Sequence, residues 1–376
     1  MAGGASRPFP YTASTPLSLP VYAQRIAETK RHCYHEVKII LGASLACDAR
    51  AEVDEATRKA VIAELGAKVS DIYVFPDKAR QIVERLNARE QSGAYRTAKD
   101  LTAFADMLTE DLRQPTGDKH LGVRYQARPM PPDTSTGKRG PTPKQERQFA
   151  EFLKSRNYDI RKVETLPGNI GYIDLRSFSQ ASAAKPALSA MMNLVADTDA
   201  LIVDLRHNGG GDPHAVAFMS SYLFDKRTHL NDMYWREGGR TEAFWTEEDA
   251  PGRKFGGTKK IYVLTSKTTF SGAEEFSYNL QQLGRGVIVG ETTGGGAHPG
   301  GVHRVHQHMA AFIPAGRAIN PISKTNWEGT GVVPDVKVAA EDALRTAERL
   351  ALTELLKSPA NEGHAQRLRQ RLDALK

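Results

Sequence analysis

The feature that most constrains the fold is an alternation of short β-rich runs with helix-length segments after Gly168. Strands that alternate with helices predict βαβ units and a largely parallel sheet, so the expected fold class is α/β. The predicted strands are 172–175, 200–205, 261–264 and 287–289, and the predicted helices between and after them are 183–195, 213–224 and 272–283.

The segment before this alternation has a helical pattern. Leu101, Phe104, Leu108 and Leu112 fall at i, i+3, i+7 and i+11, which places them on one helix face. A stretch rich in proline, glycine, serine and threonine follows and predicts a linker. We therefore expect a leader with an export segment at 1–51, a helical domain at 52–127, a connecting segment at 128–167, an α/β domain at 168–340 and terminal helices at 341–376.

Composition argues against several kinds of partner. The net charge is +7, but its charges are mixed along the chain, so we expect a solvated basic surface and no nucleic-acid partner. Cys33 and Cys47 are the two cysteines, so the rest of the chain has no thiol chemistry. Because no apolar run approaches ~20 residues, stable membrane insertion is not expected. No cofactor and no metal are predicted, and the oligomeric state is not indicated.

An apolar segment at 37–46 predicts export. It follows Lys30 and Arg31, contains Lys38 near its start and leads into Ala49-Arg50-Ala51, which has the small-x-small form of a signal-peptide cleavage site. The segment is displaced inward from Met1 compared with an ordinary export signal. The hypothesis is a periplasmic or secreted protein, with a cytoplasmic location as the alternative.

The first motif that carries chemistry spans 201–211 and reads Leu-Ile-Val-Asp-Leu-Arg-His-Asn-Gly-Gly-Gly. An apolar strand opens into three glycines before a helix that begins near Pro213. Glycines permit close approach of the backbone and direct N–H groups at an anion. The same pattern also fits a tight strand-to-helix turn. A phosphate-binding loop is not favoured, because neither G-x-G-x-x-G nor a Walker sequence is present.

The second motif places Ser271 at the start of a helix, in the sequence Thr-Thr-Phe-Ser-Gly-Ala-Glu-Glu-Phe. One interpretation is an N-cap serine with Glu274 completing a capping box. The other is a nucleophile, because the helix dipole favours developing negative charge and the Gly272 N–H can face an oxyanion. Thr269 replaces the first glycine of the G-x-S-x-G elbow, so this is not an α/β-hydrolase signature.

Two further glycine-rich segments follow in order. Residues 290–301 contain Gly-Glu-Thr-Thr-Gly-Gly-Gly, and residues 328–335 read Glu-Gly-Thr-Gly-Val-Val-Pro-Asp. With the four motifs in this order, residues 170–338 resemble the catalytic domain of the tail-specific (carboxyl-terminal processing) serine peptidases, family S41. The likeness is to the branch with the interphotoreceptor retinoid-binding protein modules and the tricorn protease core, and residues 54–125 resemble the helical amino-terminal part of that branch.

The resemblance implies a crotonase/ClpP-like ββα spiral and a serine peptidase with a peptide or protein substrate. Gly296 stands where family members with a Ser-Lys dyad carry the lysine, and no PDZ-like segment is evident. In the tricorn-like branch the base is a histidine that is backed by a glutamate. His120 and Glu328 occupy the comparable positions, and the resemblance implies Ser271 as the nucleophile. The implied oxyanion and substrate-binding residues are Asn208, Gly210, Gly211, Gly272 and Gly295.

Alternatives remain open at this point. A non-catalytic module of the same fold would bind an apolar ligand such as a retinoid or lipid, and a crotonase-type acyl-CoA enzyme shares only the fold. His207, His214 and His298 are further candidates to line a substrate site. If His120 is an unperturbed imidazole, activity should rise through pH ~6–7.5.

Overall fold

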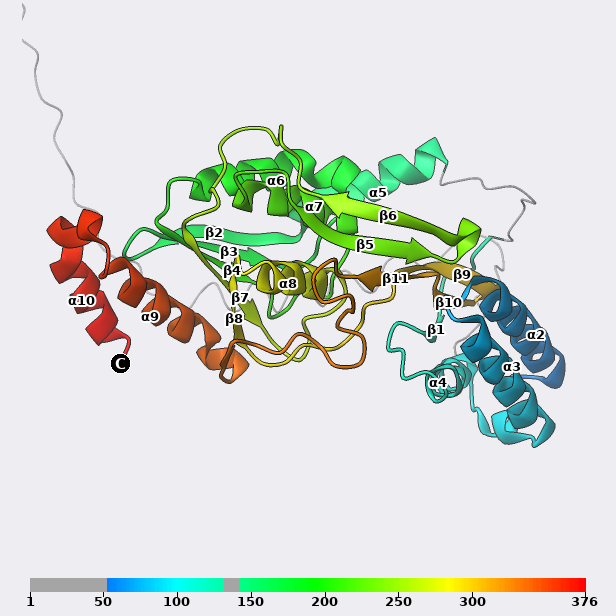
Figure 1. The fold of residues 1–376 in the computed structure, drawn as a ribbon. Helices are drawn as coiled ribbons and strands as arrows, with labels where there is room; N and C mark the ends of the chain where they lie inside the picture. The colour runs from blue at the N-terminus through cyan, green and yellow to red at the C-terminus, as the bar shows by residue number, and fades with distance from the viewer. Residues whose placement is uncertain (1–52, 132–141) are drawn as a thin grey trace, which may run out of the picture. The chain divides into compact units, whose positions relative to one another are not determined.

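The predicted alternation builds a six-stranded sheet with the order β12-β8-β7-β4-β3-β2 (Figure 1). Within this sheet, β3, β4, β7, β8 and β12 run parallel to one another, and β2 pairs with β3 in the antiparallel direction. The prediction of a largely parallel sheet is confirmed. The strands are β2 (Ile160–Leu166), β3 (Ile170–Leu175), β4 (Ala200–Asp204), β7 (Lys260–Thr265), β8 (Val287–Gly290) and β12 (Val336–Lys337).

The computed structural model describes residues 53–131 and 142–376. These residues lie in one unit that begins at Asp48. The segment predicted to direct export, 37–51, lies outside the described residues and stays a prediction. Within the described ranges, no helix combines the length and the hydropathy that crossing a membrane requires.

Helices cover both faces of the main sheet because its strands are apolar on both sides. Leu201 and Val203 point into a core shared with α6 (Ala181–Val195), α7 (Pro213–Ser220) and α8 (Gly272–Gln282). Ala200 and Ile202 point the other way, into a core with α9 (Ala343–Leu355) and α10 (Ala365–Ala374). This alternation is the period of two that a strand requires.

Two smaller antiparallel sheets were not predicted from the sequence. One has the order β1-β10-β9, and the other has the order β11-β5-β6. Their strands are β1 (Gly122–Tyr125), β9 (Gly300–His306), β10 (Met309–Pro314), β5 (His229–Trp235), β6 (Arg240–Trp245) and β11 (Gly316–Ile319).

The amino-terminal helices are α2 (Glu55–Ile72), α3 (Pro76–Gln91) and α4 (Leu101–Arg113). The four residues predicted to share one face of the last helix are all buried. The segment after α4 forms β1, which pairs with β10, and the Val74 N–H donates to the Pro314 carbonyl oxygen. The helical part is therefore joined through backbone hydrogen bonds to a hairpin that lies far along the chain.

The predicted connecting segment 128–167 contains regular structure in its second part. Helix α5 (Pro143–Ser155) begins with a capping box between Thr142 and Gln145, and β2 then completes the edge of the main sheet. The proline-rich composition concealed both. The predicted helix 213–224 ends early, at Ser220, and continues as a 3₁₀ turn. The 3₁₀ helices are Ala94–Thr97, Asn157–Asp159, Ser221–Leu223, Glu237–Gly239, Ala340–Asp342 and Pro359–His364.

Central-strand burial predicts a contrast between two leucines. Leu201 is fully buried, whereas Leu194 on α6 is 72% exposed. We expect Leu201→Ala to lower the free energy of unfolding by about 2–5 kcal/mol, because it leaves a cavity, and Leu194→Ala to change it by less than about 0.5 kcal/mol. Urea denaturation of both variants measures the difference. Equal effects would contradict the two-sided core.

Candidate active site

Ser271 lies between β7 and α8 in a backbone conformation that serine rarely adopts. Its φ is 54° and its ψ is −122°, so the residue is one of a few non-glycine positions with positive φ. A backbone of this kind costs about 1–3 kcal/mol and persists only where its surroundings impose it. The turn holds the Ser271 side chain at the N-terminal end of α8, half-exposed.

The glycine loop at the end of β4 lies directly against this turn. A Cβ on Gly210 would lie 2.7 Å from both the Gly272 nitrogen and the Ser271 Cβ, and a Cβ on Gly211 would lie 2.0 Å from the Phe178 oxygen. Both glycines have positive φ. The Phe270 N–H also donates to the Asn208 carbonyl oxygen, at 3.1 Å. The structure thus brings the first and second sequence motifs together.

The N–H groups of Gly211 and Gly272 remain available to bind an anion. Neither donates a hydrogen bond to another group in the described ranges, and a Cβ on Gly272 would lie 3.1 Å from the Gly211 nitrogen. The Gly210 N–H, which we predicted to bind the oxyanion, instead donates to Asn208 Oδ1 at 2.8 Å. Asn208 is fully buried and donates to the Leu175 carbonyl, so its side chain shapes the loop.

The buried carboxylate of Glu274 ties the serine turn to the third motif. It accepts hydrogen bonds from the N–H groups of Ser271 (2.8 Å), Gly295 (2.6 Å) and Gly296 (2.9 Å), and from Thr293 Oγ1 (2.5 Å). Burial raises the pKa of Glu274, and these hydrogen bonds oppose that rise. The predicted role of Gly295 as an oxyanion or substrate donor is corrected, because Glu274 engages its N–H.

Asp118 was missed by the sequence analysis and holds the base candidate in place. Its Oδ1 accepts the His120 backbone N–H at 2.9 Å and lies 4.0 Å from His120 Nδ1. Its Oδ2 accepts from Tyr73 Oη and contacts His298 Nδ1 at 2.7 Å. Burial alone would raise the pKa of Asp118, but the interactions with His298 and His120 outweigh it and keep the pKa below its usual range.

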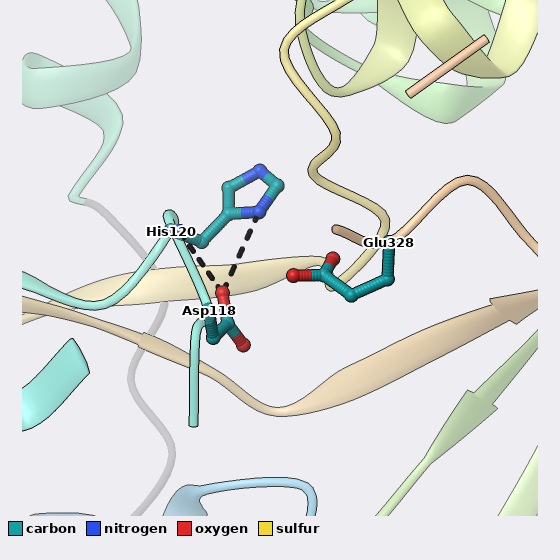
Figure 2. A group of neighbouring side chains, drawn as sticks. All are labelled: Asp118, His120 and Glu328. Carbon is teal, nitrogen blue, oxygen red and sulfur yellow. Dashed lines mark hydrogen bonds and ion pairs between the residues drawn. The ribbon is translucent and has the colours of Figure 1, made fainter. Parts of the chain in front are cut away.

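The His120 ring lies beside the serine turn. Its centroid is 4.6 Å from that of Phe270, the residue before Ser271, and 5.7 Å from that of Phe312 on β10. Burial lowers the pKa of His120 to about 4. No hydrogen bond joins His120 to Ser271 in the part of the chain that the structure describes. Figure 2 shows Nδ1 directed at Asp118 and the other ring nitrogen pointing away from both carboxylates.

Glu328 approaches the same histidine from the fourth motif. One donor atom from each of Asp118, His120 and Glu328 lies within 4.8 Å of the others. Glu328 Oε2 accepts the Ala297 N–H at 2.6 Å and lies 3.5 Å from His298 Nδ1. Burial raises the pKa of the Glu328 carboxyl to about 7. His298, predicted only as one of several site candidates, thus links the two carboxylates.

The other polar candidates lie elsewhere. His207 is exposed, and His214 packs on Phe244 beside a separate open cavity of about 630 Å³. A second cavity, of about 410 Å³, borders His120 and Phe270. Its polar and apolar wall includes Asp106, Thr109, Arg113, Lys119, Arg124, Val302 and Phe312.

The chain is similar in sequence to known peptidases. The fold is a mixed α/β fold with an N-terminal helical region, as it is in the S41 proteases, and the predicted fold class is confirmed. Residues 169–338 match the model of peptidase family S41, and residues 54–156 match the model of the N-terminal domain of peptidase S41 in eukaryotic IRBP. The chain belongs to peptidase family S41.

Individual relatives agree with this assignment. The carboxy-terminal processing protease CtpA of Bacillus subtilis is 32% identical over 143 residues, which cover 36% of this chain and 29% of the relative. Carboxyl-terminal-processing peptidase 2, chloroplastic, of Arabidopsis thaliana is 26% identical over 201 residues, or 50% of this chain and 36% of the relative. A solved lipoprotein structure from Streptococcus agalactiae shares the fold, with a TM-score of 0.52, 15% identity and coverage of 79% and 96% of the two chains.

The network around Glu274 gives a prediction with a neighbouring control. Glu274→Gln replaces an acceptor oxygen by an NH₂ group that faces backbone N–H donors. We therefore expect it to lower the free energy of unfolding by about 1–3 kcal/mol and to loosen the serine turn. Urea denaturation at pH 7, together with fluorophosphonate labelling of Ser271, measures both effects.

Glu275→Gln is the matched control. Burial raises the pKa of Glu275 to about 8, so its side chain is largely protonated at pH 7 and resembles the amide. We expect it to cost less than about 1 kcal/mol. An equal loss in both variants would show that the Glu274 network has no special role.

Proposed function

We propose that this chain is a serine-type peptidase that hydrolyses peptide bonds through an acyl-enzyme on Ser271. The observation that carries the proposal is the strained backbone of Ser271, held at a helix start against a glycine loop. A serine that only capped a helix would adopt ordinary extended angles. Strain at a single polar residue of this kind clusters at active sites.

Two backbone donors are proposed to stabilise the oxyanion. The N–H groups of Gly211 and Gly272 approach the serine from two segments and have no other acceptor in the described residues. Removing one donor from a site of this type costs about 2.7–4 kcal/mol of transition-state stabilisation. The loop around Gly210 then serves to hold the Gly211 N–H in place.

His120 is proposed as the general base. Its low pKa keeps the ring neutral at physiological pH, and its outward-facing nitrogen is directed away from Asp118 and Glu328 (Figure 2). Asp118 and Glu328 lie on the Nδ1 side, where a carboxylate stabilises the imidazolium. The mechanism requires the hydrogen bond from Ser271 to His120 to form when substrate binds, because catalytic hydrogen bonds are often long in the free enzyme.

The proposed reaction passes through an acyl-enzyme on Ser271. Ser271 Oγ attacks the scissile carbonyl carbon while its proton moves to His120, and the oxyanion forms between the two glycine N–H groups. The C–N bond then breaks as His120 returns the proton to the leaving amine. Water, deprotonated by the same histidine, then attacks the ester carbonyl, and His120 returns that proton to Ser271 Oγ as the C–O bond breaks. The cavity beside His120 and Phe270 is proposed to take a substrate side chain.

A binding module for an apolar ligand is the second candidate, and the match of residues 54–156 to the N-terminal domain found in eukaryotic IRBP favours it. The cavity beside His120 weighs against it, because Arg113, Lys119 and Arg124 contribute to its wall. An apolar ligand does not compensate for the desolvation of such charges. A binder also needs no serine in a strained backbone.

Ser271→Ala tests the nucleophile directly. We expect loss of fluorophosphonate labelling and a fall in peptide or ester hydrolysis of at least about 10³-fold, with the free energy of unfolding nearly unchanged. Mass spectrometry of the labelled peptide and urea denaturation provide the readouts. Ser92→Ala, at an exposed serine on the amino-terminal helices, should behave as wild type. Labelling that persists in Ser271→Ala refutes the assignment.

The pH dependence of kcat/KM distinguishes the titration of His120 from that of Glu328, because their pKa values differ. Because the His120 pKa is about 4, the base stays deprotonated down to that pH, and the rise through pH ~6–7.5 expected for an unperturbed imidazole does not come from His120. Glu328 loses its proton near pH 7 and only then stabilises the imidazolium. We expect kcat/KM, measured in EDTA, to rise through about pH 7 and to vanish near pH 4.

Glu328→Gln should remove the inflection near pH 7 and lower kcat by about 10²-fold or more. An inflection that persists in this variant belongs to another group. His120→Ala and Lys119→Met together test whether the base is the histidine or a lysine. Lys119 is the matched choice because it is adjacent to His120 and its Nζ donates to the Gly294 carbonyl. Retained turnover in His120→Ala with loss in Lys119→Met would replace the histidine by a lysine as base.

A further inference from the structure

The cluster of Asp118, His120 and Glu328 contains more donor atoms than its protein contacts use. One donor atom of each residue lies within 4.8 Å of the other two. The donors come from the segment between α4 and β1 and from the loop that follows β11, and Figure 2 shows both carboxylates directed towards the Nδ1 side of the imidazole. Two carboxylate oxygens and one imidazole nitrogen thus converge on one small volume.

Two of these donor atoms are buried and lack a hydrogen-bond partner. They are His120 Nδ1 and Glu328 Oε1. The His120 side chain is only 9% exposed, so water does not compensate for the missing partner on its surface. A buried polar atom without a partner costs about 1–3 kcal/mol. A group that binds both atoms at once would remove this cost.

The surroundings orient the donors as the outer contacts of a metal site do. Tyr73 Oη and His298 Nδ1 both engage Asp118 Oδ2, and the Ala297 N–H holds Glu328 Oε2. Asp118 Oδ1 and Glu328 Oε1 are thereby left to face the histidine. Hydrogen bonds to the second oxygen of each carboxylate fix the direction of the first.

We propose that Asp118, His120 and Glu328 form a binding site for one Zn²⁺ ion, and that the ion inhibits the peptidase. One nitrogen and two carboxylate oxygens with an open fourth position for water match the preference of zinc. Calcium and magnesium prefer oxygen ligands alone, whereas an imidazole nitrogen favours zinc. The inhibition, although not the binding, rests on the proposed function of His120 as base.

The distances are compatible with an ion after a small movement. His120 Nδ1 and Asp118 Oδ1 are 4.0 Å apart, whereas ligands at about 2.0–2.2 Å from a tetrahedral zinc lie roughly 3.4 Å from one another. Closing the gap requires shifts of well under about 1 Å for this pair. The Glu328 side chain is 19% exposed and lies on a loop, and it can approach the ion by rotating about its hydrogen bond to the Ala297 N–H.

Zinc and catalysis compete for the same nitrogen. To act as base through its outward-facing nitrogen, the imidazole must carry its proton on Nδ1, beside the carboxylates. A zinc ion takes the lone pair of Nδ1, so the neutral ring carries its proton on the outward-facing nitrogen, which can then no longer accept the Ser271 proton. The ion also binds the two carboxylates that would otherwise stabilise the imidazolium. Bound zinc therefore withdraws the base without blocking the cavity.

Cobalt provides a direct probe of the site. The full chain is stripped with EDTA and titrated with Co²⁺, whose visible absorption reports its ligands, and Zn²⁺ is then added to displace it. We expect one equivalent to bind to wild type, and binding at least about tenfold weaker in Asp118→Asn and Glu328→Gln. Glu328→Gln decides the result if Asp118→Asn does not fold. The control is His306→Ala, which removes one of the two neighbouring histidines, His306 and His308, at the β9–β10 turn. This variant should bind Co²⁺ as wild type does.

Labelling of Ser271 tests the inhibition separately. One equivalent of Zn²⁺ should slow fluorophosphonate labelling of wild type at least about tenfold, and EDTA should restore it. Unchanged Co²⁺ affinity in Glu328→Gln overturns the site, and labelling that zinc does not slow overturns the inhibition. If the stripped wild type is not labelled at all, the proposed peptidase function fails, and the cobalt titration still decides the zinc site.

Discussion

The arrangement of the site depends on one buried carboxylate. Glu274 accepts the N–H groups of Ser271, Gly295 and Gly296 together with the Thr293 hydroxyl, so the helix that carries the serine and the loop after β8 cannot move independently. Gly295 in turn accepts a hydrogen bond from the Gly329 N–H, beside Glu328. A charge buried in this way is stable only when it is fully hydrogen-bonded, so the network favours a single geometry.

Much of the fold could be predicted because it is encoded locally. The parallel strands are continuous apolar runs, since both of their faces are buried, and such runs are visible in the sequence without knowledge of their partners. The antiparallel strands β5, β6 and β9 were missed because their residues are mixed and their stability comes from pairing with distant segments. Strand β2 was hidden for the same reason: Arg161, Lys162 and Glu164 occupy its exposed edge.

The segments that meet around Ser271 could be selected from the sequence, whereas the individual hydrogen bonds between them could not. The order of the glycine motifs pointed to Ser271 and to the loop at Gly211 as candidate site positions, because each lies on a turn between an apolar strand and a helix that is visible in the sequence. Which N–H groups remain available is decided by side chains that approach from elsewhere. Asn208 engages Gly210, and Glu274 engages Gly295.

The position of Asp118 in the sequence could have predicted part of its role at the site. It stands two residues before His120, at a distance where an aspartate accepts the backbone N–H of the histidine and fixes the turn. What the sequence does not contain is the contact with His298, which depends on the third motif folding against the amino-terminal segment. The low pKa of His120 has the same origin, because burial by Phe270 and Phe312 is a property of the assembled protein.

The pairing of β1 with β10 has a consequence for the order of events during synthesis. The segment with His120 leaves the ribosome early, but the strand on which it packs and the loop with Glu328 are translated much later. Until then His120 lacks the hydrophobic environment that Phe312 and the serine turn provide. On the proposed mechanism, a nascent chain would therefore carry Ser271 without its activating base until the distant strands and loops had folded against the amino-terminal segment.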